Sequence, residues 1–433
     1  MRQTETALDA AVVSAGEELA RRRARFEVFA RLGESTHLVR DPDGVWRQRH
    51  TREVGVACRV ARGGEVGFAA AAGSGAKAGR EAAQAALGGL LPGADPLPPR
   101  QVLGTVSTPP PALRPDPQRQ TAFAQELASD LDGSGVRLVQ LRTLIGTSAT
   151  VLATGEGYLA RADATGSVVE LLLAPPSGPW RHFHFAARDL AEFDPLPLAA
   201  RAREAALLAV RGSQPPRALA DVVLAPAVAA PLVVALAEHV ASGGCSLPAG
   251  TRPTRVRRAW HLVDERAGPG GLLPLPCDGE GLPARRIELL GQGRIGERLA
   301  TWADAQRNGL TPGGAVRPSY RHPPTAGPAN LVVLATAGTS PQELLNELAD
   351  GCYLALPAGS VRLDAGSDRF AMRAAAVVIR QGRAVAAHPL VELRGSFRRL
   401  LAGLEAVGDD PASFSLTCAV TTPSLLFRRL EIA

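Results

Sequence analysis

The stretch from Pro276 to Tyr320 constrains the fold more tightly than any other part of the chain. It opens with an acidic turn, Asp278 to Pro283, and continues with two half-apolar runs, Arg286 to Leu290 and Arg294 to Leu299, on either side of Gly291-Gln292-Gly293. Glycine supplies the positive φ that a tight turn needs, so the pattern predicts a β-hairpin. A helix over 301–308 and a Gly/Pro-rich loop over 311–318 are expected to follow. None of these residues specifies a reaction by itself.

A chain of 433 residues is long enough for two or three domains, each with its own apolar core. It has no apolar run of about 18 residues, which a membrane-spanning helix needs. The first residues contain no apolar core of a signal peptide. The five cysteines stand singly and form no Cys-x-x-Cys pair, which suits a reducing compartment. We therefore expect a cytoplasmic protein that does not contact a membrane.

The charge pattern argues against a nucleic-acid partner. The formal net charge is +6, and Lys77 is the only lysine, so the positive charge is carried almost entirely by arginine. These arginines are interleaved with 42 acidic residues and gather only in short clusters such as Arg21 to Arg25. A nucleic-acid-binding surface would concentrate its basic residues on one face or in one run. We expect no nucleic-acid partner.

The first 91 residues predict an N-terminal α+β domain. Apolar residues recur near helical spacing from Thr4 to Leu32, which predicts one long amphipathic helix. Arg62-Gly63-Gly64 is a hairpin turn signal, and an Ala-rich helix is expected from Gly75 to Leu91. Helices and short strands in this order predict two layers. The expected strands are His37–Arg40, Gly55–Ala61 and Val66–Ala70.

Proline dominates residues 92–117 and predicts an extended connector. Residues 118–215 predict a middle α+β segment that packs with the N-terminal domain, and Gln214-Pro215-Pro216 marks its end. Helices are expected at Gln118–Leu131 and Pro195–Gly212. Between them the turn residues predict an antiparallel meander of four strands, Val136–Leu144, Ser148–Ala153, Gly157–Asp163 and Ser167–Ala174.

Residues 216–433 predict a C-terminal domain of mainly antiparallel strands with a few helices. The fold class is therefore α+β. Helices are expected at Ala227–Ser242, Pro341–Gly351 and Ser396–Val407; Ser340 is the predicted N-cap of the second, and Pro341 fits its first turn. Strands are expected at Asp221–Leu224, Asn330–Ala335, Cys352–Leu356, Val361–Asp364, Phe370–Arg380 and Ser424–Ile432.

Several of these motifs together resemble the TldD/TldE (PmbA) family. The resemblance rests first on Asp278-Gly-Glu-Gly-Leu-Pro-Ala284, the hairpin after it, and Ala305-x-Arg307-x-Gly309 before a Gly-rich loop. It extends to Gly55-Val56-Ala57-x-Arg59-Val60 with its Gly turn, and to Ser367-Asp368-Arg369-Phe370 with Ile379-x-x-Gly382. The similarity covers nearly the whole chain. It implies a two-subunit zinc metallopeptidase that trims modified peptides.

The resemblance also implies which of the two subunits this chain is like. In the active subunit, the helix corresponding to Ala227–Ser242 carries His-Glu-x-x-x-His, which binds zinc and polarises a water molecule. Here that helix reads Leu236-Ala237-Glu238-His239-Val240-Ala241-Ser242-Gly243, with one histidine and the glutamate before it. A hydrolytic zinc needs about three protein ligands. The resemblance therefore implies a TldE-like, metal-free subunit without catalytic residues, metal ligands or cofactor of its own, paired with a TldD-like, zinc-bearing partner.

The implied substrate is an unfolded or modified peptide, or an amide intermediate of a natural-product pathway. The alternative is a homo-oligomeric peptide-binding or regulatory protein without hydrolytic activity. A third hypothesis is a self-sufficient hydrolase with its site at His182 and His184, or at Cys418. No phosphate-binding loop and no Gly-x-Ser-x-Gly motif is present.

Most individual candidates have a plainer interpretation than chemistry. Asp278 and Glu280 could act as general acid and base, but acidic turns are normally solvated and structural. Cys418 occupies the place of a near-terminal cysteine that both subunits of the family carry, and a buried thiol is the favoured interpretation. His182 and His184 would share one face of a strand, most simply an exposed polar face. The residues expected to contact substrate or partner are Asp278, Glu280, Arg286, Arg307, Asn330 and Cys418.

Overall fold

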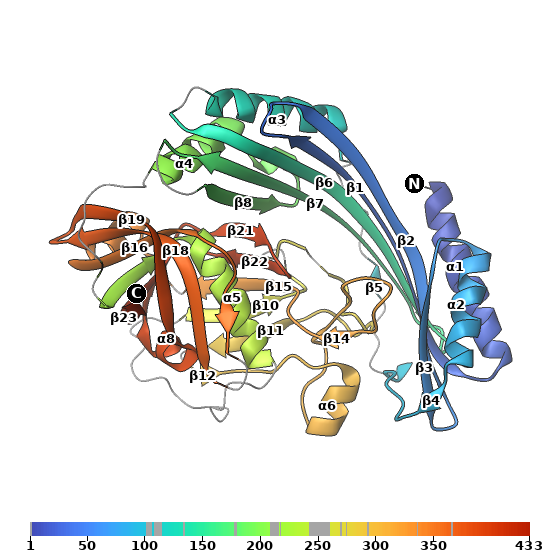
Figure 1. Cartoon of the computed structure of the whole chain (residues 1–433). Helices are drawn as coiled ribbons and strands as arrows, with labels where there is room; N and C mark the ends of the chain where they lie inside the picture. Colours follow the sequence, from blue (N-terminus) through green and yellow to red (C-terminus); the bar gives the residue numbers. More distant parts are fainter. Residues whose placement is uncertain are drawn as a thin grey trace.

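A sheet of long, curved strands arches over a β-rich C-terminal domain in the computed structural model (Figure 1). The structure describes residues 2–100, 106–107, 115–132, 135–176, 180–207, 216, 218–241, 260–268, 271–273, 275–291, 294–335, 337–364 and 367–433. The predicted α+β class is confirmed. No helix in these ranges combines the length and the apolar character needed to cross a membrane.

The N-terminal sheet combines strands from both sides of the proline-rich segment. Within the described ranges its order is β4-β3-β2-β1-β6-β7-β5, with β8 paired to β7. Because β1 pairs with β6 along most of its length, the strands before and after the proline-rich segment build one continuous sheet. The strands are β1 (Arg25–Arg40), β2 (Trp46–Arg62), β3 (Glu65–Ala72), β4 (Leu91–Pro92), β5 (Val106–Ser107), β6 (Arg137–Thr154), β7 (Leu159–Ala174) and β8 (Arg181–Ala187).

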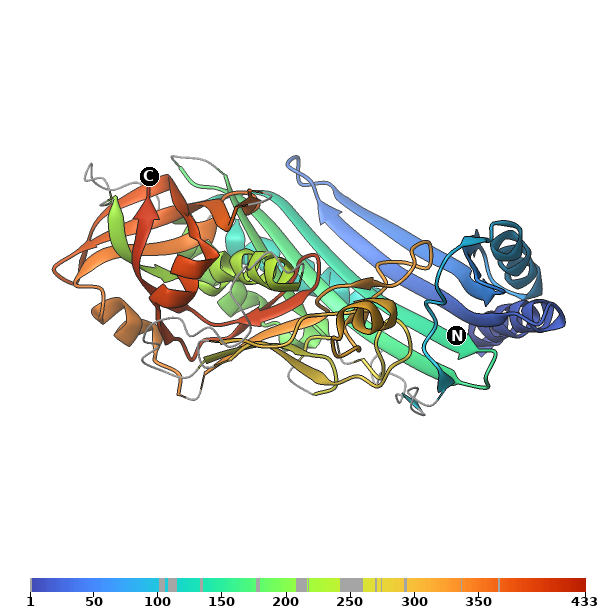
Figure 2. The same cartoon turned by 90° about the horizontal axis from the view of Figure 1, so that it is seen from below.

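Helices cover the outer face of this sheet, and the C-terminal domain lies against its inner face (Figures 1 and 2). Successive residues of a strand point to opposite faces. On β1, Val28 therefore packs with the first two helices and Leu38 with the next two, whereas Phe29 contacts Tyr320 of the C-terminal domain. The helices are α1 (Arg2–Arg21), α2 (Ala76–Gly88), α3 (Pro117–Leu131) and α4 (Pro195–Leu207).

The single helix predicted from Thr4 to Leu32 is wrong. The helix ends at Arg21, Arg23 has a φ of 52°, and β1 begins at Arg25. Phe26 and Phe29 stand three residues apart, which is helical spacing, but they lie on opposite faces of the strand. The chain forms a strand here because Phe26 and Phe29 are buried against two different partners, which a single face of a helix would not allow.

The predicted four-stranded meander is also wrong, because two long strands, β6 and β7, take its place. Gly146 and Gly166 suggest turns in the sequence, yet they pair with each other inside the β6–β7 ladder. The hairpin between β2 and β3 is confirmed. Its glycines, Gly63 and Gly64, have φ values of 60° and 83°, which residues with a Cβ rarely adopt.

Two sheets form the C-terminal domain in the part of the chain that the structure describes. The first has the order β12-β11-β10-β15-β22-β21, and the second β16-β9-β23-β19-β18-β17 with β20 on β23. Pairing of β16 with β18 closes five strands of the second sheet into a barrel. The strands are β9 (Leu219–Leu224), β10 (Trp260–Glu265), β11 (Arg286–Gly291), β12 (Arg294–Ile295), β15 (Asn330–Ala335), β16 (Asp350–Pro357), β17 (Arg362–Leu363), β18 (Arg369–Arg380), β19 (Arg383–Ser396), β20 (Leu404–Val407), β21 (Ala412–Ser415), β22 (Ala419–Thr422) and β23 (Leu425–Ile432), with β13 (Ala315–Val316) and β14 (Thr325–Ala326) as a separate pair.

Helix α5 (Pro226–Ala241) lies at the centre of the C-terminal core. It is apolar on nearly all sides, and its side chains pack against strands of both sheets. The other C-terminal helices are short: α6 (Trp302–Asn308), α7 (Pro341–Asn346) and α8 (Phe397–Gly403). Ser340 caps α7 as predicted.

Several predicted boundaries in this domain are wrong. The helix expected to reach Gly351 ends at Asn346, and the one expected to reach Val407 gives way to β20. The second strand of the 286–299 hairpin is only two residues long. Strands β10, β19, β21 and β22 are not predicted. The turn residues Gln292 and Gly293, the predicted helix end at Gly212 and most of the boundary at 214–216 lie outside the described residues.

Candidate functional site

The end of helix α5 is where the resemblance would place a zinc-binding motif. Glu238 is exposed there and accepts a hydrogen bond from the hydroxyl of Thr417, at 3.1 Å. His239 contacts different residues: its ring centroid lies 4.9 Å from that of Phe397, and its Nε2 lies 3.3 Å from Oδ1 of Asp368. The two side chains therefore engage different parts of the domain.

Cys418 lies near Glu238, but its thiol is held in the protonated form. Burial raises its pKa to about 12, and the carboxylates of Asp264 and Glu238 contribute to the shift. Zinc binds the thiolate, and a hydrolytic zinc takes about three protein ligands. Among the described residues, no group of three His, Cys, Asp or Glu side chains could hold a metal ion. Within the described residues, the donors at this helix end do not form a zinc site.

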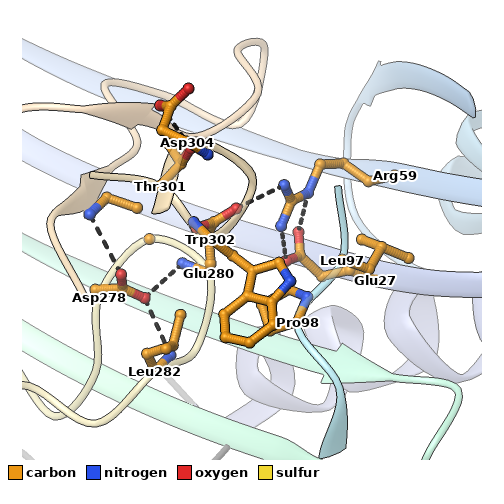
Figure 3. Close-up of polar contacts among 12 residues, drawn as sticks. Glu27, Arg59, Leu97, Pro98, Asp278, Glu280, Leu282, Thr301, Trp302 and Asp304 are labelled. Atoms are coloured by element: carbon orange, nitrogen blue, oxygen red, sulfur yellow. Dashed lines mark hydrogen bonds and ion pairs between the residues drawn. The ribbon is translucent and has the colours of Figure 1, made fainter. Parts of the chain in front are cut away.

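Asp278 organises the acidic turn that opens the 276–320 stretch. Its carboxylate accepts hydrogen bonds from the backbone N–H groups of Glu280 (2.8 Å), Leu282 (3.0 Å) and Ala315 (3.2 Å), as Figure 3 shows. Burial raises its pKa, and these hydrogen bonds act in the opposite direction. The expectation of a solvated turn is wrong, because Asp278 and Glu280 are 4% and 1% exposed.

Glu280 belongs to a buried group of four charged side chains that joins the two halves of the molecule. It accepts hydrogen bonds from Arg59 on β2, at 3.0 Å, and from the backbone N–H of Trp302, at 2.6 Å (Figure 3). Arg59 also pairs with Glu27 on β1 through its Nε (3.1 Å) and its second terminal nitrogen (2.5 Å). Arg317 pairs with Glu27 as well. We call Glu27, Arg59, Glu280 and Arg317 the interdomain ion cluster.

Charge balance lets this cluster persist away from water. All four side chains are at most 6% exposed, and two carboxylates face two guanidinium groups. Burial opposes the ionisation of Glu27, but Arg317 and Arg59 hold its pKa below the usual value. At Glu280 burial outweighs Arg59 and raises the pKa to about 6. Glu280 therefore titrates within the physiological range.

Replacing Glu280 by glutamine is expected to change the pH dependence of stability between pH 4.5 and 6. The folded-state pKa is raised above the unfolded value of 4.5, so protonation of Glu280 favours the folded state. Its contribution is fully present below pH 4.5 and is lost as the pH rises through about 6, a change of about 2 kcal/mol. Urea unfolding of both proteins at pH 4.5 and pH 7 measures it. Parallel pH profiles would contradict the assignment.

The structure distributes the predicted contact residues over separate regions instead of one site. Arg286 lies on the surface, 3.9 Å from Glu265, and Arg307 is an exposed helix residue paired with Asp304. Asn330 is buried, and its side chain accepts a hydrogen bond from the N–H of Leu273 at 2.8 Å. Asp278 and Glu280 come together in the acidic turn, and Asn330 lies beside Cys418 because it pairs with Ala419.

His182 and His184 lie on edge strand β8 and point to the inner face of the sheet, opposite Leu172 and Glu170 of β7. His182 is exposed, as predicted, whereas His184 is part of a hydrogen-bonded contact. Its Nε2 accepts from the backbone N–H of Ser415, at 3.2 Å, so its Nδ1 carries the proton that faces Glu170, at 3.4 Å. His184 thus links the sheet to β21.

A cleft of about 490 Å³ lies between this inner face and the C-terminal domain. Its floor includes Gly33, Gly146 and Gly166 on three adjacent strands, β1, β6 and β7. Sequence reasoning did not identify the cleft. The three glycines lie between the predicted elements, where glycine suggests a turn, whereas inside the observed strands glycine marks a close approach or an open space.

Comparison with known proteins gives the family. Residues 218–433 match the family model described as "PmbA/TldA metallopeptidase C-terminal domain". The chain belongs to the TldD/TldE (PmbA) family. No curated protein sequence matches it.

Solved structures show the same TldD/TldE fold across nearly the whole chain. TldE from Thermococcus kodakarensis superposes with a TM-score of 0.83 at 15% identity, covering 99% of this chain and 100% of that one. A protein described as a candidate modulator of DNA gyrase from Thermotoga maritima gives 0.80 at 16% identity, with 98% and 100% covered. A similarly described protein from Bacteroides thetaiotaomicron gives 0.77 at 14% identity, with 100% and 99% covered.

Proposed function

We propose that this chain is the metal-free, TldE-like subunit of a heterodimeric zinc metallopeptidase or amide hydrolase. In this proposal a TldD-like partner holds the zinc. The substrate is an unfolded or modified peptide, or an amide intermediate of a natural product. The observation that carries the proposal is the end of helix α5, where Glu238 and His239 contact different residues and do not converge on a metal position.

Two further observations support the subunit role. Burial raises the pKa of the Cys418 thiol to about 12, and among the described residues it joins no group of three His, Cys, Asp or Glu side chains that could hold a metal ion. Arg266, which neighbours it, is committed to structure: it pairs with Asp264 at 2.8 Å and donates to the carbonyl oxygens of Ala315 and Gly327. These contacts engage all three nitrogens of the Arg266 guanidinium within the domain.

Co-expression with a family homologue that carries His-Glu-x-x-x-His tests the proposal. The two chains are expected to co-purify with stoichiometric zinc and to cleave a fluorescence-quenched, unfolded peptide. His239→Ala in this chain is expected to leave zinc content and cleavage unchanged. Replacing either motif histidine of the partner is expected to abolish both, since a hydrolytic zinc needs about three protein ligands.

Two results would change the proposal. Stoichiometric zinc and peptide cleavage by this chain alone would show that it is a self-sufficient hydrolase. Peptide binding by a homo-oligomer, with no zinc and no cleavage in the presence or absence of the homologue, would favour the alternative of a peptide-binding or regulatory protein.

A further inference from the structure

The cleft beneath the arched sheet has a floor that lacks large side chains. Gly146 lies between Ser35 of β1 and Gly166 of β7, and in the next row Ser148 lies between Gly33 and Ala164. Stacked layers of a protein are about 10 Å apart because side chains fill the space between them. Where one layer presents only hydrogen, methyl or hydroxymethyl groups, a slot about one side chain deep is left.

Two of the three glycines on the floor of the cleft face open space. A Cβ built on Gly33 or on Gly166 would meet no other atom within 4 Å. Neither residue has a positive φ, so the backbone does not require glycine at these positions. Their missing side chains therefore open space, and the cleft volume falls within the range of about 300–1,000 Å³ that small-ligand sites occupy.

The walls of the cleft differ in polarity. Leu272 and Leu273 of the C-terminal domain form an apolar side, whereas Ser35 and Thr51 place hydroxyl groups 2.6 Å apart on the sheet. The charged side chains on the inner face balance to zero, because one arginine, Arg31, and one glutamate, Glu53, line the cleft there. Arg52 and Glu34 line it only through their backbone, because their side chains pair at 3.1 Å on the opposite face of the sheet. An uncharged ligand with both amide and apolar groups suits such walls.

The Ser35–His37 contact at the cleft serves binding and not nucleophilic chemistry. Nε2 of His37 lies 3.1 Å from the Ser35 hydroxyl, and a terminal nitrogen of Arg142 lies 3.4 Å from Nδ1. A guanidinium can only donate, so Nδ1 holds the lone pair and Nε2 carries the proton. His37 therefore donates to Ser35 and cannot remove its proton. Its pKa is lowered by burial and by Arg142, which keeps the ring neutral.

We propose that this cleft binds a short, uncharged, extended peptide segment, with its amides on the hydroxyl-bearing floor and its small apolar side chains against Leu272 and Leu273. The inference rests on the proposed function, since it assigns a holding site for the peptide within this chain. A narrow slot without side chains on its floor excludes folded or bulky segments. The slot should therefore bind segments rich in Gly, Ala and Ser more tightly than segments with larger residues.

Gly166→Val tests the proposal, because valine is compatible with a strand and its side chain would fill the open slot. The probe is the hexapeptide Ala-Gly-Ala-Ser-Ala-Gly, amidated at its C-terminus and labelled at its N-terminus with an uncharged coumarin. Its binding to the full chain is measured by fluorescence anisotropy. We expect the dissociation constant to rise by about tenfold or more in the variant. The matched control is Ala70→Val on β3, an exposed strand position outside the cleft, which is expected to bind as the parent does.

The outcomes separate this inference from the subunit role. Thermal unfolding midpoints of the parent and both variants establish that each is folded. Failure of the parent chain to bind the peptide, or equal binding by the parent and Gly166→Val, would overturn the cleft assignment and leave the zinc-partner experiment unaffected. Hexapeptides in which two alanines are replaced by glutamate or by arginine are expected to bind more weakly, and tighter binding of either would overturn the assignment to an uncharged ligand.

Discussion

Replacing Arg59 by methionine is expected to lower the free energy of unfolding by about 3–5 kcal/mol. The change removes the cation that pairs with both Glu27 and Glu280, and it leaves two buried carboxylates to share Arg317. Methionine keeps much of the length and packing of the arginine stem, so the loss reports on charge. Urea unfolding near pH 7 measures the effect. It should shrink at lower pH, because protonation of Glu280 removes one uncompensated charge.

Arg47→Met on the same strand is the matched control. Arg47 is 74% exposed and pairs with Asp41 at 3.1 Å, and a surface pair of this kind contributes about 0–1 kcal/mol. Equal losses in the two variants would mean that the interdomain ion cluster adds nothing beyond an ordinary surface pair. A large loss of stability in Arg59→Met alone would show that the interdomain ion cluster is the main polar attachment of the sheet to the C-terminal domain.

Tyr320→Ala is expected to cost about 3–5 kcal/mol, and Gly55→Ala about 1–3 kcal/mol, with strong coupling between them. The Tyr320 ring is 1% exposed and lies directly on Gly55 of β2; a Cβ at Gly55 would stand well inside the 3.0 Å that real Cβ atoms keep. Once the ring is absent, the methyl group has space. In the Tyr320→Ala background, Gly55→Ala should therefore lose most of its cost.

The four proteins of this double-mutant cycle are compared by chemical denaturation. Gly33→Ala on β1 is the control, because a Cβ there meets nothing within 4 Å, and a change within about 0.5 kcal/mol is expected. Additive effects of Tyr320→Ala and Gly55→Ala would contradict direct packing of the ring on the glycine. The same contact explains why β2 has glycine at position 55, although the dihedral angles there would also allow a residue with a side chain.

Local chemistry made some elements predictable from the sequence. The Arg62-Gly63-Gly64 turn, the capped start of α7 and the apolar strand Asn330–Ala335 depend on neighbours within a few residues, and all three are confirmed. The end of α1 and the continuity of β6 and β7 depend instead on which layer each residue meets after folding. The spacing of apolar residues and glycines along the sequence did not reveal where α1 ends or that β6 and β7 are continuous.

The site was less predictable than the fold, because its parts are distant in sequence. Glu27 and Arg317 are 290 positions apart, and Arg59 and Glu280 are 221 apart. Within its own segment Glu280 resembles any acid in a solvated turn. The cleft was equally difficult to predict, because Gly146, Gly166 and Ser35 form its floor only after β1, β6 and β7 have paired.

The closed barrel of the C-terminal domain has a consequence for biosynthesis. Strand β9 pairs with β23, so the hydrogen-bonded ladder of β9 is complete only after Leu425, the partner of Leu224, has been synthesised. At about 5–20 residues per second, translation of the roughly 200 intervening residues takes about 10–40 s. During that interval β9 and the apolar helix α5 have no finished barrel in which to bury their side chains. Nascent chains of this protein should therefore depend on chaperones that hold apolar segments, and slowing translation should lengthen that dependence.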